Sequence, residues 1–292
     1  MPEPTRRRDP VSPYDPTGID DGKGGIPIGA RRPALKATAW ISLVVIAIAI
    51  AALAWRTLER QAVDRAYADG VEALAAGRVD AARIAFDRVV EKRPRWAAAW
   101  RQRGYAAANP EQAIEDFTRA IALDAGDADA FAARGRAWIL ARQPKKAIAD
   151  FDRALALGAS GGSDAATVAR WRADRGRSHV EAGDPAAALA DLQFAAQALD
   201  APEDHRQYAL ALATTGDWPG ARTAYDRAVA PGSQPLWLGE RALVLMRLGD
   251  DDAAGVDLVR CAQLDPSCAG TFGPRAGQLA RELGRDPPPG AR

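Results

Sequence analysis

The residues that could carry chemistry in this chain of 292 residues are few. Its two histidines, His179 and His205, have no pair of carboxylates at helical spacing beside them, so both are interpreted as surface or structural side chains rather than metal ligands. No local motif has a Ser/His/Asp or Cys/His arrangement. The acidic run Asp250–Asp252 stands where a helix is expected to begin, and there it would complement the helix dipole. We therefore predict no enzymatic activity, no metal site and no cofactor.

The two cysteines, Cys261 and Cys268, are too few for a disulfide framework, and the chain has neither a CxxC motif nor a Cys/His cluster of zinc type. Two interpretations stay open. Cys261 occupies a small position in a helical pattern and would pack as a small apolar residue. Alternatively, the two thiols form a disulfide, which an oxidising compartment would permit.

The composition favours helix over sheet and argues against nucleic acid. The chain has 39 basic and 38 acidic residues, a formal net charge of +1. A protein that binds nucleic acid usually presents a strongly basic face, which this balance does not indicate. Alanine, arginine and aspartate are abundant and β-branched residues are modest, which suits helices.

An uncharged stretch, Ala37–Trp55, is long enough to cross a membrane. At 1.5 Å per residue it spans roughly 28 Å, close to the hydrocarbon thickness of a bilayer. Trp40 and Trp55 stand near its ends, as interfacial rings do. A buried soluble helix and a cleaved signal peptide are the alternatives, the latter with Ala52-Leu53-Ala54 as its small-residue site. The apolar run is longer than a signal peptide needs, so we expect an uncleaved transmembrane helix over 37–55.

Residues 1–36 are rich in Pro, Gly, Asp and Arg and are expected to form a disordered tail, which either sets topology or binds a partner or the lipid surface. Basic residues near the membrane are slightly more numerous on this side, which favours a cytoplasmic amino terminus. The Ala/Arg/Gly-rich composition suggests a bacterium, so the rest of the chain is expected in the periplasm. The basic residues compared are Lys23, Arg31, Arg32 and Lys36 before the span and Arg56, Arg60 and Arg65 after it.

Residues 128–161 contain two short amphipathic patterns with complementary sizes. The first has Phe131, Gly135 and Trp138 at helical spacing, and the second has Ala147, Phe151 and Ala154. Two such helices can press together at the small residues and bury the rings beside them. The stretch resembles the tetratricopeptide repeat (TPR), a helix–turn–helix unit of 34 residues that needs neighbouring copies to bury its apolar side.

The same pattern recurs in six units over about residues 63–268, which a plain helix bundle would not require. The small position of the first helix is Gly70, Gly104, Gly135, Gly176, Ala209 and Ala242. The large position of the second helix is Phe86, Phe117, Phe151, Leu192, Tyr225 and Leu258. The turn between the helices has Gly77, Gly183, Gly216 and Gly249, with Arg142 in the third unit.

Two departures from the pattern affect the expected stack. The second unit has a shortened turn, in which Asn109 is expected as N-cap and Pro110 as the first helical residue. Residues 158–163 insert extra Gly and Ser between the third and fourth units. They either bend the stack or loosen it into halves of three repeats, or they form a flexible surface loop. After the repeats we expect a capping helix over 271–283 and a frayed tail from Asp286.

The resemblance implies that the first helices line a concave groove that binds a protein partner. Because arginine holds carboxylates bidentately, an extended segment with acidic or C-terminal carboxylate character is the expected ligand; the alternative is that these arginines only solvate the face. The Lys/Asn carboxylate set of chaperone-tail receptors is absent. The carried-over positions are Tyr67, Val71 and Leu74; Arg101, Gln102 and Tyr105; Ala132, Arg136 and Ile139; Arg170, Asp174, Arg177 and Glu181; and Arg206, Gln207 and Leu210.

The chain is thus predicted to be all-α: a TPR solenoid of about six helix–turn–helix repeats preceded by a single transmembrane helix. The expected divisions are a tail (1–36), the span (37–55), the repeats (56–268) and a capping helix with a tail (269–292). The expected function is a scaffold for envelope-complex assembly at the bacterial inner membrane. Two other roles stay open: an apoprotein-holding TPR subunit of the kind found in cytochrome c maturation, and a regulatory subunit of a membrane enzyme or secretion complex.

Overall fold

The computed structural model describes residues 32–229 and 234–291, and the predicted all-α fold is confirmed there. The chain divides into two compact units, residues 1–61 and 62–292. The expected tail falls almost wholly outside the described residues. The helices of the described part are α1 (Arg32–Ala75), α2 (Val79–Lys92), α3 (Ala97–Tyr105), α4 (Pro110–Leu123), α5 (Ala128–Leu140), α6 (Pro144–Gly161), α7 (Ala165–Glu181), α8 (Pro185–Leu199), α9 (Pro202–Thr215), α10 (Trp218–Ala228), α11 (Pro235–Leu248), α12 (Asp251–Leu264) and α13 (Ser267–Glu282).

Helix α1 is continuous through the apolar stretch and into the first repeat. Within the described residues, its Ala39–Ala75 segment is the one helix long and apolar enough to cross a membrane, and none of its most apolar window is buried. Trp40 and Trp55 are both exposed. Apolar side chains on every face are typical both of helices that span a membrane and of signal sequences.

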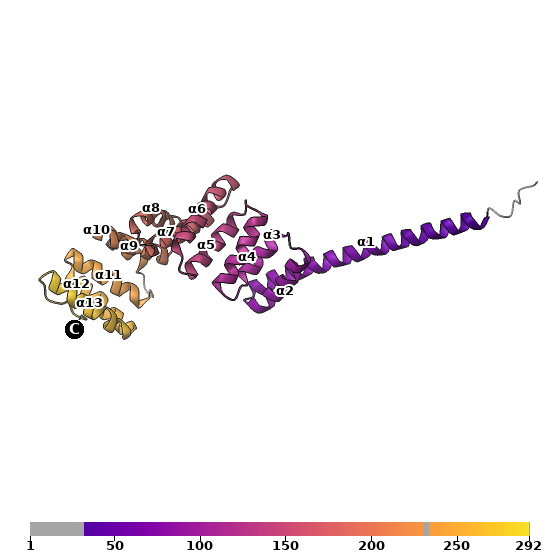
Figure 1. Ribbon diagram of the computed structural model, residues 1–292. Coiled ribbons are helices and arrows are strands. Elements are labelled where there is room, and N and C mark those ends of the chain that lie inside the picture. Colours follow the sequence, from indigo (N-terminus) through magenta and orange to yellow (C-terminus); the bar gives the residue numbers. More distant parts are fainter. Residues whose placement is uncertain (1–31, 230–233, 292) are drawn as a thin grey trace, which may run out of the picture. The chain divides into compact units, whose positions relative to one another are not determined.

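The repeat unit is built from consecutive helix pairs, which Figure 1 shows following one another along the chain. Helix starts are fixed by side chains that accept a hydrogen bond from a backbone N–H of the first turn. Asn109 accepts from Gln112 N at 2.9 Å with Pro110 at the first position of α4, which confirms the predicted short helix start. The aspartates that cap other helices in the same way are Asp127, Asp164, Asp184, Asp217 and Asp250.

The predicted turn glycines have the left-handed backbone that favours glycine. In the first unit Gly77 has φ 73°, and in the fourth Gly183 has φ 85°. Arg142 has φ 58° at the corresponding place in the third unit. The turn geometry is therefore common to these units, and in the third it is imposed on a residue with a Cβ.

The predicted matching of small and large positions determines how each pair packs. Phe151 is fully buried, and a Cβ added at Gly135 would lie 2.9 Å from its ring. At Gly104 the added Cβ would lie 2.6 Å from the ring of Phe117. Glycine at these positions lets the two helices approach until the ring of the second rests on the backbone of the first.

The inserted residues 158–163 are mostly helical, which corrects the expectation of a loop or loosened joint. Helix α6 extends to Gly161 and ends at Gly162, whose φ is 76°. Gly158 is buried, and an added Cβ there would lie 2.6 Å from the Trp171 ring of α7. Trp171 belongs to the same core cluster as Phe151, so the third and fourth repeats share one core.

The carboxyl-terminal cap is longer and better packed than expected. Helix α13 begins at Ser267 rather than Thr271, and its Phe272 lies in the core cluster of the last repeat. In the tail after Asp286, Ala291 packs on that cluster. Its approach depends on glycine, because a Cβ added at Gly255 of α12 would lie 2.9 Å from Pro289.

Cys261 of α12 and Cys268 of α13 form a disulfide, with Cα atoms 5.7 Å apart. Cys261 is also fully buried at its small position, so both open interpretations describe the same residue. The bond ties the cap to the last repeat.

Replacing Cys268 with alanine is expected to lower the free energy of unfolding of the oxidised protein by about 2.5 kcal/mol, because the bond closes a short loop in the unfolded chain. The measurement is urea unfolding with and without reductant. The free energy of unfolding of the variant should equal that of the reduced wild type. The predicted contribution would be contradicted if reductant left the stability of the wild type unchanged while the variant was less stable than the wild type by the same amount with and without reductant.

Candidate partner-binding groove

Three arginines and two aspartates meet in a cavity of about 520 Å³, to which three consecutive first helices contribute these charged side chains. Arg136 comes from α5, Arg170, Asp174 and Arg177 come from α7, and Asp204 comes from α9. Because first helices of successive repeats supply them, the cavity lies on the face where the TPR resemblance placed the groove. Four of the predicted groove residues are brought together here, and Asp204 was not foreseen.

Asp174 organises this cavity because it is shared by two arginines. Arg136 Nε donates to one carboxylate oxygen at 2.7 Å, and Arg177 donates to the other. Asp174 is buried, whereas the two arginine side chains are 43% and 41% exposed. Arg170 is exposed and forms no ion pair with a described residue. Burial raises the pKa of Asp204, which opposes its negative charge. The cavity therefore carries a surplus of positive charge, centred on Arg170 and the outer edges of the two shared arginines.

The other predicted groove arginines already hold carboxylates of their own chain. Arg101 donates from one nitrogen to both oxygens of Asp127, at 2.7 and 2.9 Å. Arg206 forms two hydrogen bonds of 2.7 Å with Glu240 of α11, and Gln207 donates to Glu203 at 2.6 Å. The two arginines connect successive first helices, whereas the Gln207 contact lies within α9, and in both cases less hydrogen-bonding capacity faces a ligand.

The predicted aromatic groove residues divide between core and surface. Tyr67 stacks on Trp96 at the start of α3, with ring centroids 4.5 Å apart, and meets Phe86 edge-on, so it packs between the first and second repeats. Tyr105 is 42% exposed and meets Phe117 edge-on. Gln102, on the same helix as Tyr105, is half-buried. It does not line the charged cavity.

A second cavity, of about 460 Å³, lies between α9, α10, α11 and α13. Leu210, Trp218, Leu243 and Phe272 contribute apolar surface to it. Arg247 stands over the Trp218 ring and pairs with Glu282 at 3.6 Å. The sequence interpretation named only Leu210 here, because it ended the groove at the fifth repeat. Leu243 comes directly after the small residue of the sixth repeat, in the same way that Arg136 comes directly after the small residue of the third. Extending the groove positions to the sixth repeat by this spacing would have located Leu243.

The opposite side of the repeats has a recurrent feature that the sequence interpretation missed. An arginine just before the small residue of the first helix donates two hydrogen bonds to an aspartate just before the large residue of the second. Arg134 and Asp150 are joined in this way at 2.8 and 2.7 Å. We call these contacts the interhelix ion pairs. Their members are Arg103–Asp116, Arg134–Asp150, Arg175–Asp191 and Arg241–Asp257.

Each of these arginines also reaches the second helix of the preceding repeat. Arg175 donates to Asp152, and Arg134 donates to Thr118 at 3.1 Å. Hydrogen bonding to Asp191 raises the pKa of Arg175, so the guanidinium is held in its charged form. The repeated offset of one residue from the small and large positions was a signal available in the sequence.

His205 is structural, as expected, but it is buried rather than on the surface. Its Nε2 lies 2.8 Å from Asp200, whose φ of 48° ends α8. That interaction lowers the pKa of Asp200. Among the described residues no group of three or more metal-ligating side chains is found.

The fold and its groove define a helical-repeat scaffold. A tetratricopeptide repeat profile matches residues 105–163, 173–235 and 209–267, together more than half of the chain. The chain therefore belongs to the tetratricopeptide repeat family, and its fold is one that binds proteins or peptides. A search of curated protein sequences found no significant match.

Solved structures share this fold at low sequence identity. PilF of Pseudomonas aeruginosa is 19% identical with a TM-score of 0.61, covering 71% of this chain and 93% of its own. PilW, described as a widely conserved type IV pilus biogenesis factor, is 19% identical with a TM-score of 0.59, covering 76% and 99%. YrrB, described as a TPR protein with an unusual peptide-binding site, is 18% identical with a TM-score of 0.54, covering 68% and 97%.

Proposed function

We propose that this protein is a membrane-anchored TPR scaffold that binds an extended segment of a partner in the groove of its first helices. The observation that carries the proposal is the charged cavity around Asp174. Three arginines surround it, and one of them, Arg170, is in direct contact with no acidic side chain among the described residues, although its charge acts at longer range on Asp164. A carboxylate of the bound segment would complete this set, because arginine holds carboxylates in strong, directional hydrogen bonds.

The second cavity extends the proposed ligand chemistry. Helix α9 lines both cavities, with Asp204 in the charged one and Leu210 in the apolar one. A segment that runs along α9 would place a carboxylate near Arg170 and an apolar side chain near Trp218 and Phe272. Aromatic and arginine side chains at the centre of an interface contribute most of its binding free energy.

Arg170→Glu is expected to reduce partner capture at least tenfold without changing helicity. It removes a charge-assisted hydrogen bond worth roughly 1.5–3 kcal/mol and adds repulsion. The measurement is recovery of crosslinked partner from intact membranes. The matched control is Arg88→Glu, which makes the same charge change at an exposed position of α2. Equal capture by the two variants would remove the groove from the proposal.

Arg170 is a better test than the groove arginines at Arg136 and Arg177. Reversing both of those charges would leave the buried carboxylate of Asp174 among acidic neighbours. An unpaired buried charge destabilises the fold, so lost binding would then have two explanations.

The proposed location is the bacterial inner membrane, with the amino terminus cytoplasmic and the repeats periplasmic. The exposed apolar helix supports an anchor, and the Cys261–Cys268 disulfide supports an oxidising compartment. Envelope-complex assembly is the process this location favours. A reporter fused after Ala291 tests the orientation. Activity of a periplasm-specific reporter supports periplasmic repeats. Activity of a cytoplasm-specific reporter rejects them, and with them a partner in the periplasm.

A further inference from the structure

The fifth repeat lacks the interhelix ion pair found in the second, third, fourth and sixth. Tyr208 stands where those repeats have arginine, and Ala224 stands where they have the paired aspartate. In the preceding repeat Gln193 replaces the second acid, which is Asp152 in the contact with Arg175. All three substitutions fall at the joint between the fourth and fifth repeats. The charged side chains that occupy the corresponding place in other repeats are therefore missing there.

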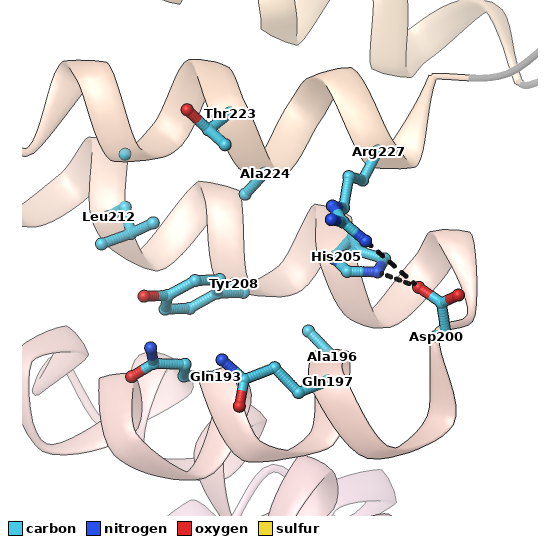
Figure 2. A pocket seen from close by; sticks show the side chains of 11 residues that line it. Gln193, Ala196, Gln197, Asp200, His205, Tyr208, Leu212, Thr223, Ala224 and Arg227 are labelled. Carbon is cyan, nitrogen blue, oxygen red and sulfur yellow. Dashed lines mark hydrogen bonds and ion pairs between the residues drawn. The ribbon is translucent and has the colours of Figure 1, made fainter.

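A cavity of about 520 Å³ opens there, between α8, α9 and α10. Figure 2 shows Tyr208 in its middle, with Gln193 and Gln197 on one side and Thr223 and Ala224 on the other. Two second helices, α8 and α10, border it, so it lies on the opposite face from the groove.

The floor of this cavity is apolar. Ala196, Leu212 and Ala224 are buried, and the ring of Tyr208 is half-buried beside them. An aromatic ring in an apolar recess of this size favours a second ring, which gains both buried area and an offset or edge contact.

The rim offers hydrogen-bonding groups that the protein does not use. Gln193 and Gln197 are one helical turn apart on α8, and neither side-chain amide has a hydrogen-bond partner among the described residues. The hydroxyl of Tyr208 has none there either. At the far end Asp200 is instead engaged, at 2.8 Å by His205 and at 3.9 Å by Arg227, as Figure 2 shows.

From these contacts we propose that the cavity is a second docking site, on the face opposite the groove, which receives an aromatic side chain of a protein segment. A side-chain amide has one carbonyl acceptor and an N–H₂ donor, the same pair of groups that a peptide backbone presents. Two such amides beside an apolar recess match an aromatic residue together with its flanking peptide bonds. The far end contributes little to charge recognition, because Asp200 already contacts His205 and Arg227.

The experiment uses N-acetyl-L-tryptophanamide as the probe, because it combines an indole ring with two amides. Saturation-transfer difference NMR is measured on the full-length protein in lipid nanodiscs, with empty nanodiscs subtracted. The wild type is expected to transfer saturation to the indole protons. N-acetyl-L-alaninamide, which has the amides without the ring, is expected to show at most a fifth of that signal.

The matched variant gives the fifth repeat the residues of its neighbours: Tyr208→Arg, Ala224→Asp and Gln193→Asp. Because the second, fourth and sixth repeats fold with this set, the variant is expected to keep wild-type helicity, fill the cavity and lower the signal at least fivefold. A second variant, Gln193→Leu with Gln197→Leu, keeps the ring recess and is expected to weaken binding of the amide probe more than binding of free indole.

Two results would overturn the proposal. One is an equal signal from the wild type and the folded triple variant. The other is a stronger signal from adenosine than from the tryptophan amide that also disappears in the triple variant, since this would assign the cavity to a nucleobase instead of a peptide.

Discussion

Phe151→Ala is expected to lower the free energy of unfolding by about 3–5 kcal/mol, the usual cost of removing a fully buried ring. Phe151 has no exposed surface and rests on the backbone of α5 at Gly135. The loss combines the buried apolar area with the cavity left behind. Urea unfolding of the full-length protein in detergent, followed by circular dichroism, measures it.

A matched control and a double-mutant cycle between positions 135 and 151 make this prediction specific. Phe194→Ala deletes the same ring at a position that is 37% exposed, and it is expected to cost about 1 kcal/mol. Gly135→Val is expected to cost about 1–3 kcal/mol by overpacking against Phe151. The two changes at 135 and 151 together should cost less than their sum, because the valine methyls enter the space the ring vacates. A loss below about 1.5 kcal/mol for Phe151→Ala would contradict the packing described.

Asp150→Ala is expected to destabilise the protein by about 3 kcal/mol, because it leaves the largely buried guanidinium of Arg134 without its acidic partner. The side chains of Asp150 and Arg134 are 8% and 19% exposed, so water replaces the lost partner poorly. The lower end of the range for buried pairs applies because the arginine is partly solvated. The measurement is again urea unfolding.

The informative comparison is the double variant Arg134→Leu with Asp150→Ala. The TPR pattern has leucine at the position of Arg134, and apolar replacement of a buried ion pair is often neutral or stabilising. The double variant should therefore recover at least about 2 kcal/mol of the loss. As a control, Asp152→Ala removes an acid that is 55% exposed and should cost below about 1 kcal/mol. A double variant as unstable as Asp150→Ala would show that the pair stabilises the fold beyond satisfying its own charges.

The repeats and their packing could be predicted from the sequence because the signal was periodic. Small and large positions six times over determined the helix pairs, the turns and the residues in contact. The helical course of residues 158–161 could not be predicted in this way, since Gly and Ser have low helix propensity and only burial against Trp171 explains their conformation. The same is true of the tail, where Pro289 packs against Gly255.

The candidate site was predictable only in part. Position along the first helix located Arg136, Arg170, Asp174 and Arg177, which the structure brings into one cavity. Whether an arginine is available depends on acids supplied by other helices, as Glu240 is supplied to Arg206, and sequence spacing within one repeat contains no such information. The cavity at Tyr208 could be found only by comparing repeats after the ion pairs were known.

The arginines of the interhelix ion pairs also couple each repeat to the one before it. In a linear array, stability is the sum of each repeat's own folding free energy and the coupling between neighbours. Arg103, Arg175 and Arg241 each bond to an aspartate of the preceding repeat, and Arg134 bonds to Thr118. Tyr208 has no such bond across to α8. This part of the coupling is therefore missing between the fourth and fifth repeats, where the packing of α8 against α9 holds the two repeats together without it.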